Sequence, residues 1–175
     1  MNPSTWSGPF LVACGLLVVS GAGKVRDPEA ASRALSAVGL PASGWMVRSG
    51  GALEAGLGLA AGCLAGAPLT LAVAAVYLAF AGFIVLTLRR GGSQASCGCF
   101  GRADARPSVT HVVLDAAGVA AAFAAAASGP SVRLTAVLAQ QPLAGVPFVV
   151  AAATAAYLVH LAFVFPPGRR VWTST

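Results

Sequence analysis

The chain has 175 residues, of which 57% are hydrophobic and only 9% charged, and its mean hydropathy is +0.81. A soluble domain carries roughly a quarter charged residues, because its surface must be hydrated. The composition therefore excludes a water-soluble enzyme, and it excludes a disordered chain, which needs low hydrophobicity and high net charge. It predicts an all-α integral membrane protein whose solvent is the lipid bilayer.

The net charge of +6 and the isoelectric point near 9.9 do not indicate nucleic-acid binding. A nucleic-acid-binding surface needs a basic helix face or a basic patch interleaved with aromatic residues, and the sequence has neither. Basic residues of a polytopic membrane protein gather in its cytoplasmic loops, which raises the isoelectric point without any polyanionic partner.

Five apolar segments predict membrane-spanning helices within a single domain that covers residues 1–175. They comprise residues 9–23, 51–66, 69–88, 109–127 and 144–165. About 20 residues are needed to cross the hydrocarbon core, so the third and fifth segments are long enough and the first two are short. Ala67 and Pro68 are expected to join the second and third segments in a tight hairpin.

The segment of residues 27–40, between the first two spans, is too polar to cross a membrane. Asp27 followed by Pro28 predicts the start of a helix, which we expect to lie along the cytoplasmic interface. No basic residue precedes the first apolar segment, so we do not expect it to be a cleaved signal peptide.

The distribution of basic residues predicts the orientation of the chain. With the N-terminus outside and the C-terminus in the cytoplasm, ten of the eleven Lys and Arg residues fall on the cytoplasmic side and only Arg133 falls outside. The predicted location is the inner (plasma) membrane. The ten are Lys24, Arg26, Arg33, Arg48, Arg89, Arg90, Arg102, Arg106, Arg169 and Arg170.

Ionisable residues inside membrane spans are rare and costly, so each one here is a functional candidate. They all fall in the predicted cytoplasmic half of the bilayer: Lys24, Glu54, His111, Asp115 and His160. His111, Asp115 and Gly118 recur at i, i+4 and i+7, which places them on one face of a helix.

Glu54 begins a four-residue stripe with Gly58, Gly62 and Gly66, a pattern of small residues that lets two helices approach closely. Glu54 is therefore expected to point into the bundle. It is either a structural carboxylate paired with Lys24 or Arg48, or a catalytic or proton-handling group.

Similar alternatives exist for the histidines. His111 and Asp115 either form a packing hydrogen bond or serve in proton handling. His160 by itself is more typical of a core histidine whose polar atoms are satisfied.

Cys97 and Cys99 lie one residue apart in a glycine-rich segment, and we interpret them as a redox-active dithiol. A disulfide between residues i and i+2 closes a small strained ring, and strained disulfides are typically catalytic or regulatory. Nearby Arg89, Arg90 and Arg102 favour the reactive thiolate. No metal site is predicted, because a closed zinc site needs four ligands and only Asp104, His111 and Asp115 are near in sequence. The two alternatives are a metal site that uses both thiolates and a loop whose cysteines are inert.

Cys14 and Cys63 lie within apolar helices near the predicted outer face. Each is most simply a small buried hydrophobe. The alternative is a second thiol pair on the oxidising side of the membrane, and electron transfer between the two pairs would then need a carrier such as a quinone.

These features together resemble the methylamine utilisation protein MauE and its DoxX-like relatives. The resemblance covers roughly residues 10–127 and rests on Lys24-Val25-Arg26-Asp27-Pro28 after the first span, Glu54 in the second, and Ser96-Cys97-Gly98-Cys99-Phe100-Gly101 after the third. It implies a DoxX-like four-helix transmembrane core, here with one additional span, and thiol-disulfide chemistry beside a thioredoxin-like partner.

The resemblance also implies which residues matter. Cys97 and Cys99 would be the reactive pair, with Lys24, Arg26, Asp27 and Glu54 as supporting polar groups. For the members that give the family its name, it implies a role in producing periplasmic methylamine dehydrogenase, through disulfide formation or through transport of the small subunit. Such a role favours a periplasmic cysteine segment, whereas the charge distribution places this segment in the cytoplasm.

The sequence therefore predicts a membrane-embedded thiol-disulfide redox protein. Two other classes remain open. One is a small transporter with Glu54, His111, Asp115 and His160 around a substrate vestibule. The other is a non-catalytic assembly partner that recruits a thioredoxin-like protein.

Overall fold

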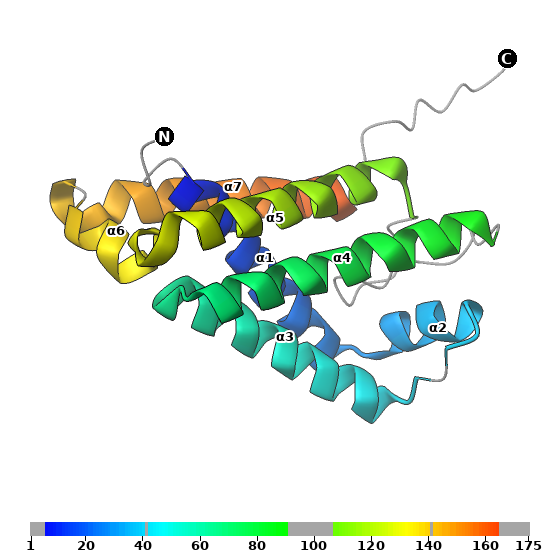
Figure 1. Ribbon diagram of the computed structural model, residues 1–175. Coiled ribbons are helices and arrows are strands. Elements are labelled where there is room, and N and C mark those ends of the chain that lie inside the picture. The colour runs from blue at the N-terminus through cyan, green and yellow to red at the C-terminus, as the bar shows by residue number, and fades with distance from the viewer. Residues whose placement is uncertain (1–5, 41, 91–106, 141, 165–175) are drawn as a thin grey trace, which may run out of the picture.

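The computed structural model describes residues 6–40, 42–90, 107–140 and 142–164, and every regular element within them is helical. The prediction of an all-α protein is confirmed for this part of the chain. The elements, shown in Figure 1, are α1 (Ser7–Arg26), α2 (Glu29–Ala37), α3 (Gly44–Leu64), α4 (Ala67–Arg89), α5 (Val109–Ser128), α6 (Leu134–Gln140) and α7 (Val146–Val164), with 3-10 turns at Gly129–Val132 and Pro142–Gly145.

Four long helices form the core of the fold. Helix α1 packs on α3 and on α5, and α4 packs on the same two helices, so the four enclose a common interior. Helix α7 lies alongside α1, outside this group (Figure 1). This arrangement agrees with the predicted four-helix core and one further helix.

Three of the described helices are long and apolar enough to cross a membrane: α1, α4 and α5. The apolar part of α7, Val146–Leu161, is shorter. Helix α3 has 21 residues, but Arg48, Glu54 and its glycines lower its hydropathy. The five predicted spans therefore all correspond to helices, and three of them meet the length and composition of a span.

The boundaries of the second span and its hairpin differ from the prediction. Helix α3 begins at Gly44, seven residues before the predicted start, because amphipathic sequence continues the helix beyond the apolar run. The turn to α4 consists of Ala65 and Gly66, with Ala65 in a left-handed conformation (φ 36°), rather than Ala67 and Pro68. Pro68 lies in the first turn of α4, where its missing N–H costs nothing.

The predicted interfacial helix is present as α2. The Asp27 carboxylate accepts a hydrogen bond from the Glu29 N–H at 3.3 Å, next to the helix start. Buried alanines of α2 face the bundle, and the helix is tied to its surroundings at two points. Ser32 donates to the Ala42 carbonyl, and Arg90, at the end of α4, donates to the Val38 carbonyl.

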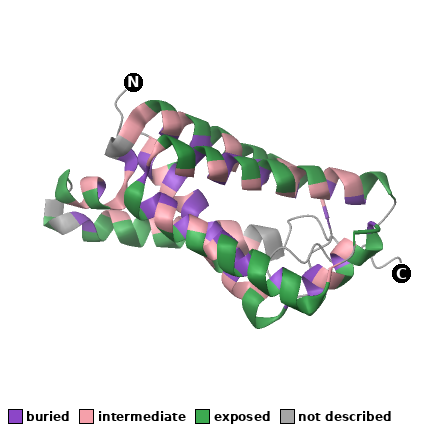
Figure 2. Cartoon of the chain, turned by 60° about the horizontal axis from the view of Figure 1, so that its bottom comes forward, coloured by how far each residue is buried: buried purple, intermediate pink, exposed green. Residues whose placement is uncertain are grey.

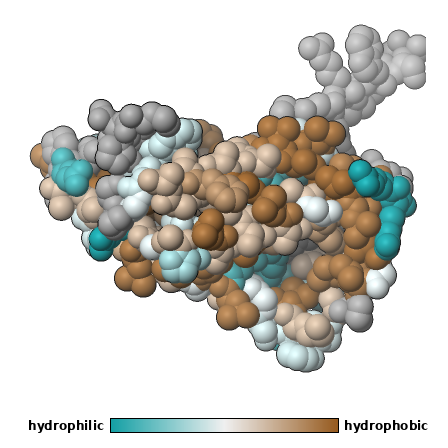
Figure 3. All heavy atoms as spheres, in the orientation of Figure 1, coloured by the Kyte–Doolittle hydropathy of each residue, from teal (hydrophilic) through white to brown (hydrophobic). Residues whose placement is uncertain are grey.

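Burial and hydropathy follow the pattern of a helical membrane bundle. Buried residues lie on the helix faces that look toward one another, and exposed ones on the outer faces (Figure 2). On the face drawn in Figure 3, hydrophobic residues cover much of the flank between the two ends of the molecule. The outer surface includes large apolar side chains such as Leu53, Leu59 and Leu78, which are more than half exposed. Their natural environment is lipid rather than water.

Candidate functional site

Helices α1 and α3 approach each other closely because glycines remove side chains from their interface. A Cβ atom at Gly21 would lie 2.3 Å from the Gly51 carbonyl oxygen, and one at Gly51 would lie 2.7 Å from the Gly21 oxygen. About two helical turns further along α3, a Cβ at Gly58 would lie 2.6 Å from the Cys14 backbone oxygen. The predicted glycine stripe thus contributes Gly58, and the Gly21–Gly51 contact adds a second close approach that the sequence analysis missed.

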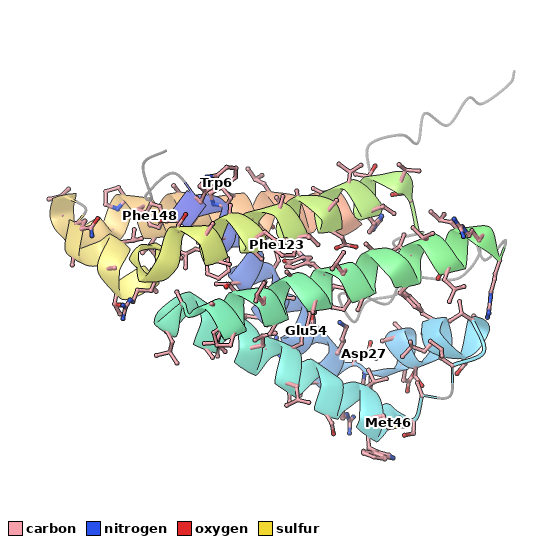
Figure 4. All side chains as sticks on the ribbon, in the orientation of Figure 1. Trp6, Asp27, Met46, Glu54, Phe123 and Phe148 are labelled. Atoms are coloured by element: carbon pink, nitrogen blue, oxygen red, sulfur yellow. The ribbon has the colours of Figure 1, made fainter. Side chains whose placement is uncertain are left out.

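This close approach brings Lys24 and Glu54 together. The Lys24 ammonium donates to Glu54 Oε2 at 2.5 Å, and the side chains are only 13% and 7% exposed. The ammonium also lies 4.4 Å from the centroid of the Phe80 ring on α4. Figure 4 shows Glu54 within the bundle, whereas Met46 points away from it. Of the two basic partners expected for Glu54, Lys24 is the one that pairs with it, and Arg48 is exposed.

His111 and Asp115 lie buried on one face of α5, as their spacing predicts. The Ser108 hydroxyl lies 2.7 Å from His111 Nδ1, so the histidine forms a hydrogen bond with the residue that precedes the helix. The Lys24 ammonium acts electrostatically on the Asp115 carboxylate. Lys24, Glu54 and Asp115, from three different helices, are called the charged cluster below.

Tyr77 on α4 completes the contact between the four helices. Its hydroxyl donates to the Ala13 carbonyl of α1 at 2.8 Å, and its ring packs edge-on against Phe80. On the other side, a Cβ at Gly118 of α5 would lie 2.8 Å from the Tyr77 ring, so only glycine fits there without displacement. Asp115 and Glu54 both act electrostatically on the Tyr77 hydroxyl.

One end of the bundle collects most of the described basic residues. There α1 and α4 end while α3 and α5 begin (Figure 1), and we call it the basic end. It carries Lys24, Arg26, Arg48, Arg89 and Arg90. Arg133, which precedes α6, lies beyond the opposite end of α5. Of the predicted supporting residues, Arg26 and Asp27 are exposed and lie apart from the buried ion pair.

Cys97 and Cys99 lie outside the described residues. Cys14 and Cys63 are free thiols that line the same apolar groove of about 220 Å³, which is also bordered by Gly58 and Phe148. Cys14 is buried and Cys63 is exposed. Both cysteines therefore border a single groove. Among the described residues, no group of three or more His, Cys, Asp or Glu side chains is arranged to hold a metal ion.

A family model described as methylamine utilisation protein MauE matches residues 1–129. The chain belongs to the MauE family. Membership implies a membrane protein of methylamine utilisation, and the long apolar helices agree with that. Neither the comparison with curated proteins nor that with solved structures gave a match.

Two aromatic residues of the site, Tyr77 and Phe80, were not among the sequence candidates. They lie three positions apart on α4, which is typical of a helix face that packs on the core. The pattern alone does not separate these two residues from the other apolar residues of a membrane helix. Their contacts in the structure distinguish them, because Lys24 lies over the Phe80 ring and Gly118 leaves room for the Tyr77 ring.

Proposed function

We propose that this MauE-family chain is a membrane thiol-disulfide exchange protein of methylamine utilisation, in which Cys97 and Cys99 cycle between dithiol and disulfide. Its partner is a thioredoxin-like protein. The proposal draws its support from the sequence of the cysteine segment and from the positions of Arg90 and Ser108, which flank this segment in the part of the chain that the structure describes.

The observation that carries the proposal is where these flanks lie. Arg90, which ends α4, and Ser108, which precedes α5, both belong to the basic end, beside the charged cluster. Arginine side chains favour the thiolate over the thiol, and the thiolate is the nucleophile in disulfide exchange. The described flanks of the cysteine segment therefore carry a cation at the same end of the bundle as the buried Lys24–Glu54 pair.

The proposed reaction is balanced without a metal. A Cys97 thiolate attacks one sulfur of the partner disulfide, which cleaves that S–S bond and forms a mixed disulfide. Cys99 then attacks Cys97 Sγ, which forms the Cys97–Cys99 disulfide and releases the partner as a dithiol. Two electrons and two protons pass from this chain to its partner, and the reverse reaction oxidises the partner.

The test is cysteine labelling with a membrane-impermeant thiol reagent in a Cys14→Ala/Cys63→Ala background, where only Cys97 and Cys99 remain. Intact cells and inside-out vesicles are compared, with and without prior reduction. We expect labelling to rise after reduction. If the N-terminus is outside as proposed from the charge distribution, labelling occurs only in inverted vesicles.

Two outcomes would contradict parts of the proposal. Labelling from outside would refute the proposed orientation and would favour a periplasmic disulfide role. Labelling that reduction never changes, together with no exchange between the purified protein and a thioredoxin-like protein, would refute the redox function.

A transporter is the second candidate, because Glu54 Oε1 is buried and has no hydrogen-bond partner within the described residues. A Cys97→Ser/Cys99→Ser variant separates the candidates. Thiol exchange disappears in this variant, whereas transport through the bundle survives. Partner binding that persists without any redox change would indicate a non-catalytic assembly role.

A further inference from the structure

The charged cluster lacks one positive charge. Lys24 pairs with Glu54 and also acts electrostatically on Asp115, and the two carboxyl groups are only 7% and 3% exposed. If these three groups are ionised and His111 is neutral, one unit of negative charge is left uncompensated among the described residues of the bundle interior. An uncompensated buried charge is costly, so the interior favours an additional positive charge.

The hydrogen bonds of the two carboxyl groups indicate which of them binds the additional proton. Glu54 already accepts the short hydrogen bond from Lys24. Within the described residues the Asp115 carboxyl has no hydrogen bond, although it lies within the electrostatic reach of Lys24 on α1 and Tyr77 on α4. The Tyr77 hydroxyl is neutral and donates to the Ala13 carbonyl, so it does not supply the missing charge.

A chain of polar groups leads from Asp115 to the basic end. His111 lies one turn earlier on the same face of α5 and is 1% exposed. Its Nδ1 atom lies 2.7 Å from the Ser108 hydroxyl, and Ser108 is partly exposed at the start of the helix. An imidazole and a hydroxyl each both donate and accept hydrogen bonds, which is what proton transfer between neighbours requires.

We propose that Asp115 is a buried proton-binding site whose exchangeable proton reaches the basic end through His111 and Ser108. Glu54 stays ionised and holds Lys24 in place, beside Phe80. The use of this proton in thiol-disulfide exchange rests on the proposed function, because such exchange releases and consumes protons at the same end of the bundle. The proton site itself does not depend on the cysteines.

Infrared spectroscopy of the full-length protein in lipid nanodiscs tests the site directly. We expect a C=O stretching band of a protonated carboxylic acid at neutral pH. Isotopic labelling of aspartate carboxyl carbons shifts this band without any mutation, so the assignment stands even if a variant fails to fold. The band disappears in Asp115→Asn. It is also lost in Glu54→Gln, because Asp115 is then the carboxyl group left to balance Lys24.

The path is tested by the rate at which this band shifts after transfer to D₂O. We expect His111→Gln to slow the exchange roughly 10²-fold, at the low end of what a positioned acid–base group contributes. His160→Gln is the matched control, since it changes the other membrane histidine and leaves α5 intact. Ser108→Ala slows the exchange as well, because it removes the hydroxyl beside His111.

The outcomes separate this inference from the redox proposal. The band is also measured in Cys97→Ser/Cys99→Ser, where it persists if the proton site is independent of the thiols. A spectrum without an aspartic acid band, or an equal exchange rate in His111→Gln and His160→Gln, overturns the site or its path. A folded state stabilised by added Na⁺ in place of a protonated band would show that a metal cation balances the cluster instead.

Discussion

The Lys24–Glu54 ion pair gives the sharpest test of how the core is held together. Lys24→Met leaves Glu54 buried without its cation, and removing one partner of a buried pair costs about 3–5 kcal/mol. The same change removes the contact with the Phe80 ring, which is worth up to roughly 2 kcal/mol when desolvated. We therefore expect Lys24→Met to be strongly destabilising.

Removing the Glu54 carboxylate should lower the free energy of unfolding by less than removing the Lys24 ammonium. Glu54→Gln leaves the ammonium buried, but Asp115, on which Lys24 acts electrostatically, can then ionise and become its counterion. Replacing both partners removes the buried charges together, and such replacements are often nearly neutral. We therefore expect Lys24→Met/Glu54→Gln to be more stable than Lys24→Met alone, so that the double-mutant cycle gives a coupling energy of roughly 1–3 kcal/mol.

The measurement is the free energy of unfolding in mixed micelles, followed by helical circular dichroism as the denaturing detergent is raised. The matched control is the Arg33–Glu29 pair of α2, whose atoms are 3.4 Å apart and whose side chains are 66% and 78% exposed. Arg33→Met should change stability by less than about 0.5 kcal/mol, because exposed pairs contribute little. A double variant as unstable as the sum of the two single ones would refute the interaction between Lys24 and Glu54.

Three further predictions use the same assay. Gly58→Ala should destabilise the fold by about 1–3 kcal/mol, because its Cβ would overlap the α1 backbone. The control is Gly56→Ala in the same helix, whose Cβ meets nothing within 4 Å and which should be neutral or slightly stabilising. Equal effects of the two variants would contradict the close α1–α3 contact. Gly118→Ala should cost a similar amount, because its Cβ would lie 2.8 Å from the Tyr77 ring; no loss would show that the ring moves aside freely. Tyr77→Phe should cost about 1 kcal/mol for the lost hydrogen bond to α1, and a neutral result would show that this hydrogen bond does not stabilise the fold.

Helical periodicity and charge placement predicted the parts of the fold that depend on local sequence. The long helices, the short helix α2 and the shared face of His111 and Asp115 all follow from patterns within one segment. Helix ends were less predictable. The first turns of helix α3, residues 44–50, contain Arg48, Ser49 and two glycines, which interrupt the apolar run, and α6 is a short helix between the fourth and fifth predicted spans.

The pairing of Glu54 depended on information that no single segment contains. Lys24 and Arg48 both lie at the basic end, so the sequence left both as partners. The structure selects Lys24 because Gly21 and Gly51, each three residues before a member of the pair, let α1 and α3 touch. A Gly-x-x-Lys in one span and a Gly-x-x-Glu in the next is a signal that could have found the contact, but only after the two helices were known to pack together.

The charged cluster lies within the part of the chain that matches the MauE family, whereas the C-terminal helix α7 lies outside that part. The family match ends at residue 129, just after α5, so the four core helices and every member of the charged cluster lie inside it. Helix α7 lies beyond the match and packs mainly on α1. The buried ion pair, the α5 polar face and both flanks of the cysteine segment thus belong to one structural unit, and a common function for them requires no contribution from α7.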